Sequence, residues 1–188
     1  DMAHRNGNKL LKMVTELLDF QKVEQSAEQV RLQDIELPML LRVQLEKFAL
    51  AAQEKHIQLC IETCPQQQIH SDVKMMDLIL ENLLSNAIKY TPKNSHIVIR
   101  TEKRGKQAIV SISDDGNGIA DEIKPRIFDM FYSGANQIAD SRRSLGLGLS
   151  LCKSIINAHG GELTVSDNLP HGTVFTFTLP AGEVKVYE

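Results

Sequence analysis

The sequence lacks most features that would place it among metal-binding, secreted or membrane-spanning proteins. Its three cysteines, Cys60, Cys64 and Cys152, form no Cys-x-x-Cys pair and have no nearby histidine at metal-ligand spacing, so we predict reduced thiols in the core. No apolar run approaches the roughly 18 residues of a membrane span, and the first residues do not form a signal-peptide pattern. We expect a soluble, cytosolic fragment, although its parent protein need not be soluble.

The chain also lacks a large excess of charge of either sign. Its 21 Lys and Arg residues face 24 Asp and Glu residues, which leaves a net charge of -3 at pH 7. No overall field attracts nucleic acid, so nucleic acid is not an expected partner and any anion site must be local. With 188 residues, 42% of them hydrophobic, the chain can bury the core of one domain and carry an appendage.

The appendage is predicted at the N-terminus. Apolar residues at positions 10, 11, 13, 14, 17 and 18 form one stripe of a helix over residues 8–22, which needs a packing partner. Residues 26–33 are polar and weakly patterned, so we predict a linker there. The expected division is therefore an N-terminal segment over 1–25, the linker, a domain over 34–182 and a tail over 183–188.

Within the domain, hydrophobic periodicity predicts three helices and several strands. Proline 38 opens the first helix, Ser71 or Asp72 can cap the second, and Gly160 and Gly161 end the third. The helices are expected over 38–55, 72–90 and about 148–159, with a short one over 121–128, and the strands over 56–62, 96–102, 107–113, 162–167 and 173–179. Because these elements do not alternate as βαβ units, we predict a mostly antiparallel sheet covered by helices.

The stretch SISDDGNGIAD, residues 111–121, begins as a strand and then cannot continue as one. It contains Gly116 and Gly118, although a plain turn needs only one glycine. Asp114 at a strand end can accept a hydrogen bond from the amino group of a purine, and backbone without side chains lets a flat ring approach closely. A type I turn with solvated aspartates explains this stretch equally well when it is taken alone.

Two further stretches have residue types that suit a nucleotide site. Gly146 and Gly148 precede a predicted helix, where free N–H groups and the helix dipole can bind phosphate. Asn82, Asn86 and Lys89 share one edge of the second helix and can hold hydrated Mg²⁺ and phosphate oxygens. Taken singly, a tight junction and a solvated polar face explain these stretches more simply. Their occurrence together and in order favours one nucleotide site.

Four ordered motifs make the chain resemble a known family. ENLLSNAIKYT, DDGNGI, IFDMFY and LGLGLSL are similar to the N, G1, F and G2 boxes of the ATP-binding domain of bacterial sensor histidine kinases. The resemblance covers residues 34–180 and implies the two-layer α/β sandwich shared with gyrase, Hsp90 and MutL, the Bergerat fold, with about three helices on one face of a mixed, mostly antiparallel sheet. Residues 1–25 resemble the second helix of the family's dimerisation hairpin, and RRSLGLGLSLCKSIINAHGG weakly resembles the potassium-responsive members.

The resemblance implies roles for the matched residues in binding ATP and Mg²⁺. Asn86 would coordinate Mg²⁺ beside Asn82, Lys89 would meet phosphate, and Asp114 would read adenine. The catalytic candidates are Glu81, Asn82, Asn86 and Lys89. The other residues expected to contact the nucleotide are Tyr90, Gly116, Gly118, Ile119, Phe131, Arg142, Arg143, Leu145, Gly146, Leu147, Gly148, Leu149 and Thr173. Phe128 and Phe131 match the F box, and residues 132–145 would form a lid.

The chain departs from the family pattern in two places. Ser144 replaces the first glycine of the G2 box, which puts the hinge of the lid in doubt. The phosphoacceptor box, a histidine followed by an acidic residue and a nearby proline, is absent. His4 is followed by Arg5, Asn6 and Gly7, none of which can take its proton, so we expect the acceptor histidine on a helix outside this sequence.

Three functions are open on the sequence. A histidine kinase domain would pass the γ-phosphoryl of ATP to that histidine, in a homodimeric, membrane-anchored parent that signals to a response regulator receiver domain. A gyrase-like or chaperone-like ATPase would need a glutamate four residues before the Mg²⁺ asparagine, but Asn82 stands there and Glu81 lies about 100° around the helix. A degenerate nucleotide-binding module that acts through protein contacts is favoured only by Ser144. The sequence favours the kinase.

Overall fold

The computed structural model describes residues 31–63, 67–132 and 146–181, and four single residues near the N-terminus. Its α-helices in these ranges are α2 (Leu37–Glu54), α3 (Val73–Tyr90) and α4 (Gly148–Ala158). The strands are β1 (Gln33–Glu36), β2 (Gln58–Glu62), β3 (Gln68–Ser71), β4 (His96–Arg104), β5 (Gln107–Asp114), β6 (Leu163–Asp167) and β7 (Thr173–Pro180). The 3₁₀ turn η2 spans Lys124–Arg126.

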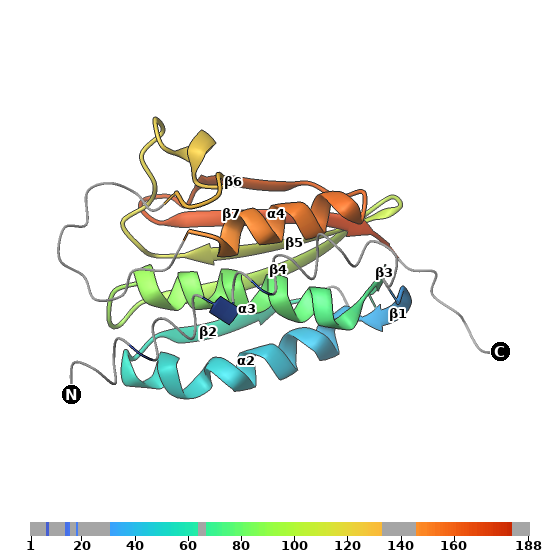
Figure 1. The fold of residues 1–188 in the computed structure, drawn as a ribbon. Coiled ribbons are helices and arrows are strands. Elements are labelled where there is room, and N and C mark those ends of the chain that lie inside the picture. The colour runs from blue at the N-terminus through green and yellow to red at the C-terminus, as the bar shows by residue number, and fades with distance from the viewer. Residues whose placement is uncertain are drawn as a thin grey trace.

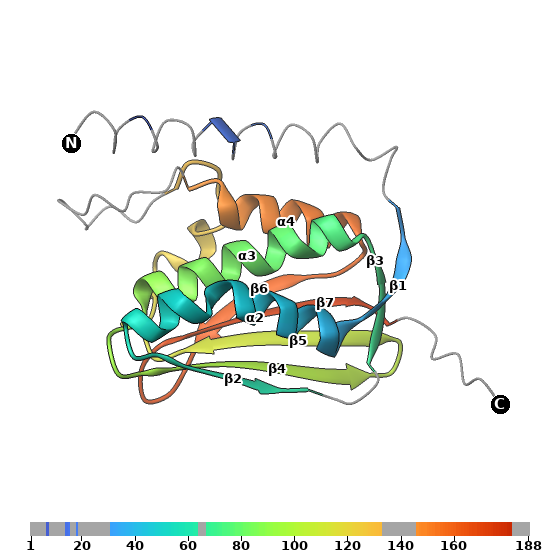
Figure 2. The ribbon, with the colours of Figure 1, turned by 90° about the horizontal axis from the view of Figure 1, so that it is seen from below.

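Five strands form one sheet in the order β2-β4-β5-β7-β6. β2 and β4 are parallel, and the other neighbours are antiparallel. All three helices cover the same face of this sheet, and β1 pairs with β3 as a separate ribbon beside it (Figures 1 and 2). The predicted two-layer α/β sandwich with a mixed, mostly antiparallel sheet is confirmed.

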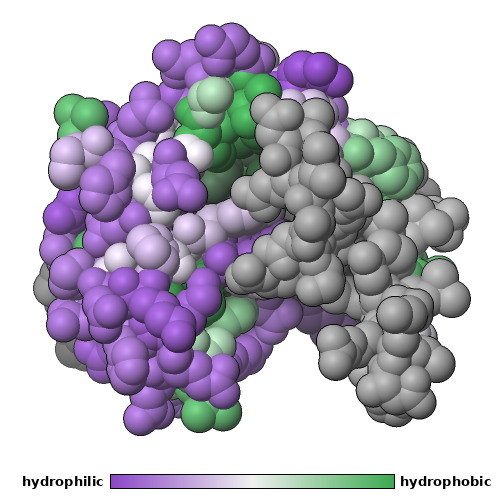
Figure 3. All heavy atoms as spheres, turned by 90° about the vertical axis from the view of Figure 1, so that its left-hand side faces the viewer, coloured by the Kyte–Doolittle hydropathy of each residue, from purple (hydrophilic) through white to green (hydrophobic). Residues whose placement is uncertain are grey.

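One end of the sandwich collects three element termini. β5 and α3 both stop on the left-hand side of Figure 1, and α4 begins there. Figure 3 views this end directly and shows apolar surface in green between polar surfaces in purple. The motifs at these termini are therefore carried to one end of the domain, although they are far apart in the sequence.

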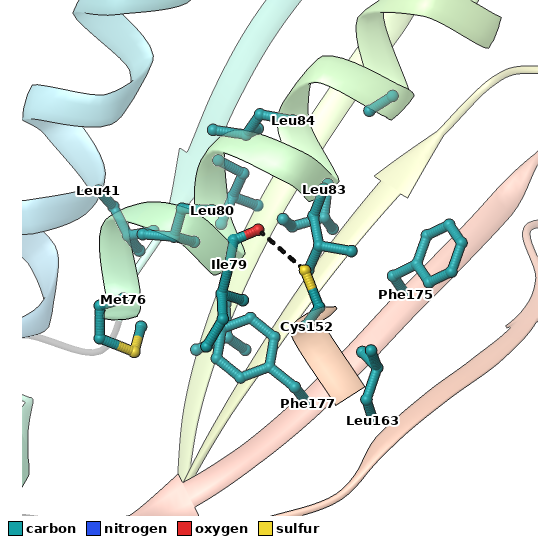
Figure 4. Close-up of a cluster of buried hydrophobic side chains, with 14 of the residues drawn as sticks. Leu41, Met76, Ile79, Leu80, Leu83, Leu84, Cys152, Leu163, Phe175 and Phe177 are labelled. Carbon is teal, nitrogen blue, oxygen red and sulfur yellow. Dashed lines mark hydrogen bonds between the residues drawn. The ribbon is translucent and has the colours of Figure 1, made fainter. Parts of the chain in front are cut away.

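The helices are fixed by local signals and by an apolar layer between them and the sheet. Asp72 caps α3 by accepting hydrogen bonds from the backbone of Lys74 and Met75. Burial opposes the charge of Asp72, but these two amides and that of Arg31 outweigh it and lower its pKa. The apolar layer between the helices and the sheet contains side chains of α2, α3, α4, β6 and β7, among them Leu41, Met76, Ile79, Leu80, Leu83, Leu84, Cys152, Leu163, Phe175 and Phe177 (Figure 4).

The cysteines divide differently from the prediction. Cys152 lies in the core, where its thiol is 3.8 Å from the Ile79 carbonyl oxygen, and burial raises its pKa to about 12. Cys60 is exposed, so the prediction of a core thiol was wrong there. Strand β2 is at the edge of the sheet and alternates its side chains, which turns Cys60 outward. Cys64 lies outside the described residues.

Other differences concern short elements. Residues 33–36 form β1, and β3 was not predicted, because four-residue strands contain too few alternations to be recognised. The helix expected over 121–128 is reduced to η2, where the Lys124 ammonium binds the carboxylates of Asp121 and Asp167 at 2.5 and 2.7 Å. Of the helix expected over 8–22, Val14, Thr15 and Leu18 are helical, as is Gly7 just before it, and its other residues lie outside the described ones. No helix within the described residues combines the length and hydropathy needed to cross a bilayer.

Candidate nucleotide-binding site

Asp114 ends β5 as a buried carboxylate, with 4% of its surface exposed. Its Oδ1 accepts hydrogen bonds from the backbone N–H of Gly116 at 2.8 Å and of Thr173 at 3.3 Å. Burial raises the pKa of Asp114, Asp115 raises it further, and the two N–H groups oppose the rise. No hydrogen bond to Oδ2 is formed by the described parts of the chain, so this second carboxylate oxygen is available to a ligand that brings an N–H group.

The end of β5 meets the end of α3 at Gly116. A Cβ atom on Gly116 would lie 2.7 Å from Oδ1 of Asp114 and 3.1 Å from the carbonyl oxygen of Tyr90. A side chain at position 116 would therefore crowd both the carboxylate of Asp114 and the backbone of Tyr90. Tyr90, the last residue of α3, is thereby held beside Asp114.

The β6–β7 turn closes the same end from the other side. Gly172 has φ +120°, and a Cβ atom there would lie 1.8 Å from the Asp114 carbonyl oxygen. Asn168 donates to that oxygen from Nδ2 at 3.0 Å, and Gly118 lies against the backbone of Gly172. The sequence analysis singled out Thr173 from this turn but missed Asn168 and Gly172, since only their place opposite β5 gives them importance.

The middle of α3 meets the start of α4. Asn82 donates from Nδ2 to the Leu78 carbonyl at 2.8 Å and turns Oδ1 toward Gly148, where a Cβ atom would lie only 2.3 Å away. Asn86 is half-buried on the next turn of α3. Lys89 donates to the hydroxyl of Tyr90 at 3.0 Å, and its Nζ lies 4.7 Å from the ring centroid of that tyrosine.

Glu81 faces away from α4. Its carboxylate accepts a hydrogen bond from Lys47 of α2 at 2.8 Å. Asn82, one residue later, turns its amide to α4. Glu81 and Asn82 therefore lie on different flanks of α3, as the 100° step per residue predicts.

The two ends of the expected lid lie together. A Cβ atom on Gly146 would be 2.4 Å from the Tyr132 carbonyl oxygen. Phe128 packs edge-on against Phe175 with ring centroids 6.4 Å apart, whereas Phe131 is exposed. Leu147 is buried, and Ile119 and Leu149 pack partly buried against the core. Arg142, Arg143, Ser144 and Leu145 lie outside the described residues.

The donor atoms suit a metal that is shared with phosphate. The described residues contain no group of three or more His, Cys, Asp or Glu side chains that could hold a metal by themselves. The half-buried amide of Asn86, one helical turn after Asn82, offers a hard oxygen. One protein oxygen, with phosphate and water supplying the rest, is the way Mg²⁺ is commonly bound.

Comparison with known proteins agrees with this geometry. The family model described as "Histidine kinase-, DNA gyrase B-, and HSP90-like ATPase" matches residues 71–183, more than half of the chain. The chain belongs to this family. The predicted family is thus confirmed. The chain carries the ATPase catalytic domain of the histidine kinase branch, because its relatives include sensor proteins and its structural neighbours include histidine kinase catalytic domains.

The curated relatives are longer than this chain, and several are named as sensor proteins. Sensor protein KdpD of Clostridium acetobutylicum is 40% identical over 112 residues, which are 60% of this chain and 12% of KdpD. The non-motile and phage-resistance protein of Caulobacter vibrioides is 32% identical over 94% of this chain and 22% of its own. Sensor protein SrrB of Staphylococcus aureus is 31% identical over 94% of this chain. The chain spans only 12 to 30% of the length of these three relatives.

Solved structures of histidine kinases share the fold. The catalytic domain of histidine kinase ThkA is 31% identical with a TM-score of 0.71, covering 80% of this chain and 95% of the ThkA chain. Full-length ShkA, solved with AMPPNP, is 27% identical with a TM-score of 0.82 and covers 94% of this chain and 37% of ShkA. ShkA, which shares this fold, was thus solved as a complex with a nucleotide analogue.

Proposed function

We propose that this histidine kinase domain binds Mg-ATP where β5, α3 and α4 meet, and passes the γ-phosphoryl to a histidine on a dimerisation helix of its own parent protein. One observation carries the proposal: α3 touches both glycine motifs, Gly116 through Tyr90 and Gly148 through Asn82. Asn82 and Tyr90 are about 12 Å apart along the helix axis. That separation suits a ligand with a base at one end and phosphates at the other.

The β5 end of the site would hold the adenine. The Oδ2 atom of Asp114 can accept a hydrogen bond from the purine amino group, and Thr173 orients the carboxylate through its N–H. Gly116 and Gly118 keep side chains out of the path of the base. Ile119 and Tyr90 would contact its faces.

The α4 end would hold the phosphates and Mg²⁺. Asn86 supplies an oxygen for the metal with Asn82 beside it, and Lys89 supplies positive charge for a phosphate. Backbone N–H groups at Gly146, Leu147, Gly148 and Leu149 lie at the start of α4, where the helix dipole favours an anion. When bound, Mg²⁺ neutralises phosphate charge. We also assign Phe131, Arg142, Arg143 and Leu145 to this phosphate-binding end of the site.

Phosphoryl transfer is favoured over hydrolysis by the residues of α3. A water-activating base would be expected at position 82, where the side chain is an amide without useful basicity. Glu81 is paired with Lys47 on the α2 side. In the transfer, a bond forms between the acceptor imidazole nitrogen and Pγ while the bond from Pγ to the bridging oxygen of ADP breaks, so positioning and charge neutralisation carry the catalysis.

The rest of the signalling protein is proposed from its relatives. We place this domain on the cytoplasmic side of a membrane-anchored, homodimeric parent with a response regulator as partner. ThkA, 27% identical with a TM-score of 0.74 in its complex, was solved with the response regulator protein TrrA. ATP is a cytoplasmic substrate, which agrees with the same placement.

The proposal is tested in two steps. Calorimetry with Mg-AMPPNP should show stoichiometric binding, and omission of Mg²⁺ should weaken it. Labelled ATP should then transfer its γ-phosphoryl to the dimerisation hairpin of the parent supplied in trans, but not to a hairpin whose histidine is replaced by glutamine. Absence of nucleotide binding would refute the site, phosphate release without a histidine acceptor would select the ATPase, and binding without either activity would select the degenerate module. A stable phosphohistidine on this chain alone would contradict an acceptor outside it.

A further inference from the structure

The C-terminal end of α3 lacks the donor that a continuing helix would provide. The last intrahelical bond runs from the N–H of Thr91 to the Ala87 carbonyl at 2.9 Å. The carbonyl of Ile88 would next accept from residue 92, which is a proline without an N–H group. The final carbonyls of α3 therefore need donors from elsewhere, at the point where Lys89 and Tyr90 enter the candidate site.

Lys55, the C-cap residue directly after α2, supplies these donors. Its ammonium lies 2.6 Å from the Ile88 carbonyl oxygen, 2.9 Å from that of Thr91 and 3.2 Å from that of Lys89. Its positive charge also faces the negative end of the α3 dipole. One side chain at the end of α2 thus binds three carbonyl oxygens at the end of α3.

The backbone around Lys55 fastens the same region. The N–H of Asn94 donates to the Lys55 carbonyl at 3.1 Å, and the N–H of Gln58 donates to the Ser95 carbonyl at 2.9 Å. On the far side of this loop, the N–H of His96 donates to the Asp115 carboxylate at 2.9 Å. The segment that follows α3 is therefore held between Lys55 and the residue next to Asp114.

We infer that Lys55 is a positioning residue for the nucleotide site, which rests on the function proposed above. It fixes the turn of α3 that presents Lys89 to phosphate and places the Tyr90 carbonyl against Gly116. Lys55 itself acts only through these residues. Without its ammonium, the last turn of α3 is expected to unwind to satisfy its carbonyls with water, which displaces Lys89 and Tyr90 together.

The test compares three lysine variants by calorimetry with Mg-AMPPNP. Lys55→Met keeps most of the side-chain length but removes the donors, and should raise the Kd about tenfold. Lys55→Arg, which keeps donors and charge, should recover most of the affinity. Lys93→Met is the matched control, because it removes an exposed positive charge from the segment that follows α3, and should leave the Kd within about twofold. Should Lys55→Met fail to fold, Lys55→Gln takes its place.

A double-mutant cycle separates positioning from a general loss of stability. If Lys55 acts in part through Lys89, the Kd of the double variant rises by less than the product of the two single increases, because only the effect of Lys55→Met on Tyr90 remains to be added. A Kd increase of the double variant equal to the product of the two single increases would overturn the inference. A Lys55→Met variant that binds like the wild type or like Lys93→Met would overturn it as well. A wild-type chain that does not bind Mg-AMPPNP would instead refute the proposed function, so the two failures are distinct.

Discussion

At the end of β5 the candidate site is made of backbone and one buried carboxylate, whereas at the start of α4 it is made of a side-chain amide that faces a glycine. The β5 end is enclosed by Gly116, Gly172 and the Tyr90 carbonyl. The α4 end depends on the rotamer of Asn82 and its bond to Leu78. Backbone cannot yield without moving whole strands, but an amide can rotate.

This difference suits two tasks. A fixed carboxylate in a rigid frame distinguishes one base from another, because a wrong donor pattern leaves a buried polar atom unpaired. A contact made by a rotatable side chain can follow a phosphate chain that is shortened when a phosphoryl group leaves. We therefore expect substitutions at the β5 end to weaken the binding of every adenine compound, and those at the α4 end to affect only ligands that carry phosphates.

The largest effect is expected for Gly172→Ala. The new Cβ atom would overlap the Asp114 carbonyl, and an L-residue is strained at φ +120°. We expect the free energy of unfolding to fall by about 3 kcal/mol and nucleotide binding to be lost. Urea unfolding followed by circular dichroism, with calorimetry for the nucleotide, measures both.

Gly105→Ala is the control for Gly172→Ala. Gly105 also has a positive φ, +60°, but a Cβ atom there would meet nothing within 4 Å. Gly105→Ala should lower the free energy of unfolding by about 1 kcal/mol through backbone strain and leave the affinity for nucleotide unchanged. Equal losses in the two variants would show that the contact of Gly172 with Asp114 is unimportant.

Asp114→Asn comes next, and it should change affinity and stability in opposite directions. An amide can present a donor where the purine amino group needs an acceptor, so the Kd for both adenosine and Mg-AMPPNP should rise at least about tenfold. The free energy of unfolding at neutral pH should increase, since the variant no longer buries a charge. Asn can still accept from Gly116 and Thr173.

The pH dependence of this stabilisation follows from the raised pKa of Asp114. Below the usual aspartate pKa of 3.8, the carboxyl is protonated in both the folded and the unfolded wild type, and Asp114 carries no penalty. Above the raised pKa of the folded state, the full penalty is present. The advantage of Asp114→Asn in urea unfolding should therefore grow as the pH rises through this window. An advantage that does not change with pH would contradict the buried charge.

Gly148→Ala should have the smallest effect on the fold. Its Cβ atom would displace the Oδ1 of Asn82, which can rotate, and alanine is a good helix former. We expect a stability change within about 1 kcal/mol and a several-fold rise in the Kd for Mg-AMPPNP, with adenosine binding unchanged. Calorimetry with both ligands checks this. A parallel loss of adenosine binding would remove the distinction between the two ends.

Much of this site was predictable from sequence, for reasons visible in particular residues. Asp72 and Pro92 are local signals that delimit α3, so the helix edge bearing Asn82, Asn86 and Lys89 could be placed in advance. The alternation along β5 likewise predicts which of its side chains are buried. Glycines at 116, 118, 146 and 148 marked element ends where a ligand can approach. β1, β3 and the exposure of Cys60 could not be foreseen, since they depend on pairing partners and on the order of strands in the sheet.

The sequence by itself determined the helix boundaries, the ordered polar motifs and membership of the family, because caps, periodicity and glycine spacing act over a few residues. Only the tertiary structure decided that Lys55 binds the carbonyls at the end of α3, that Glu81 pairs with Lys47 and that the turn at Gly172 packs against Asp114. These contacts join residues 33 to 58 positions apart, and no local pattern encodes them. Burial against the shared sheet brings them together, and it also sets the raised pKa of Asp114.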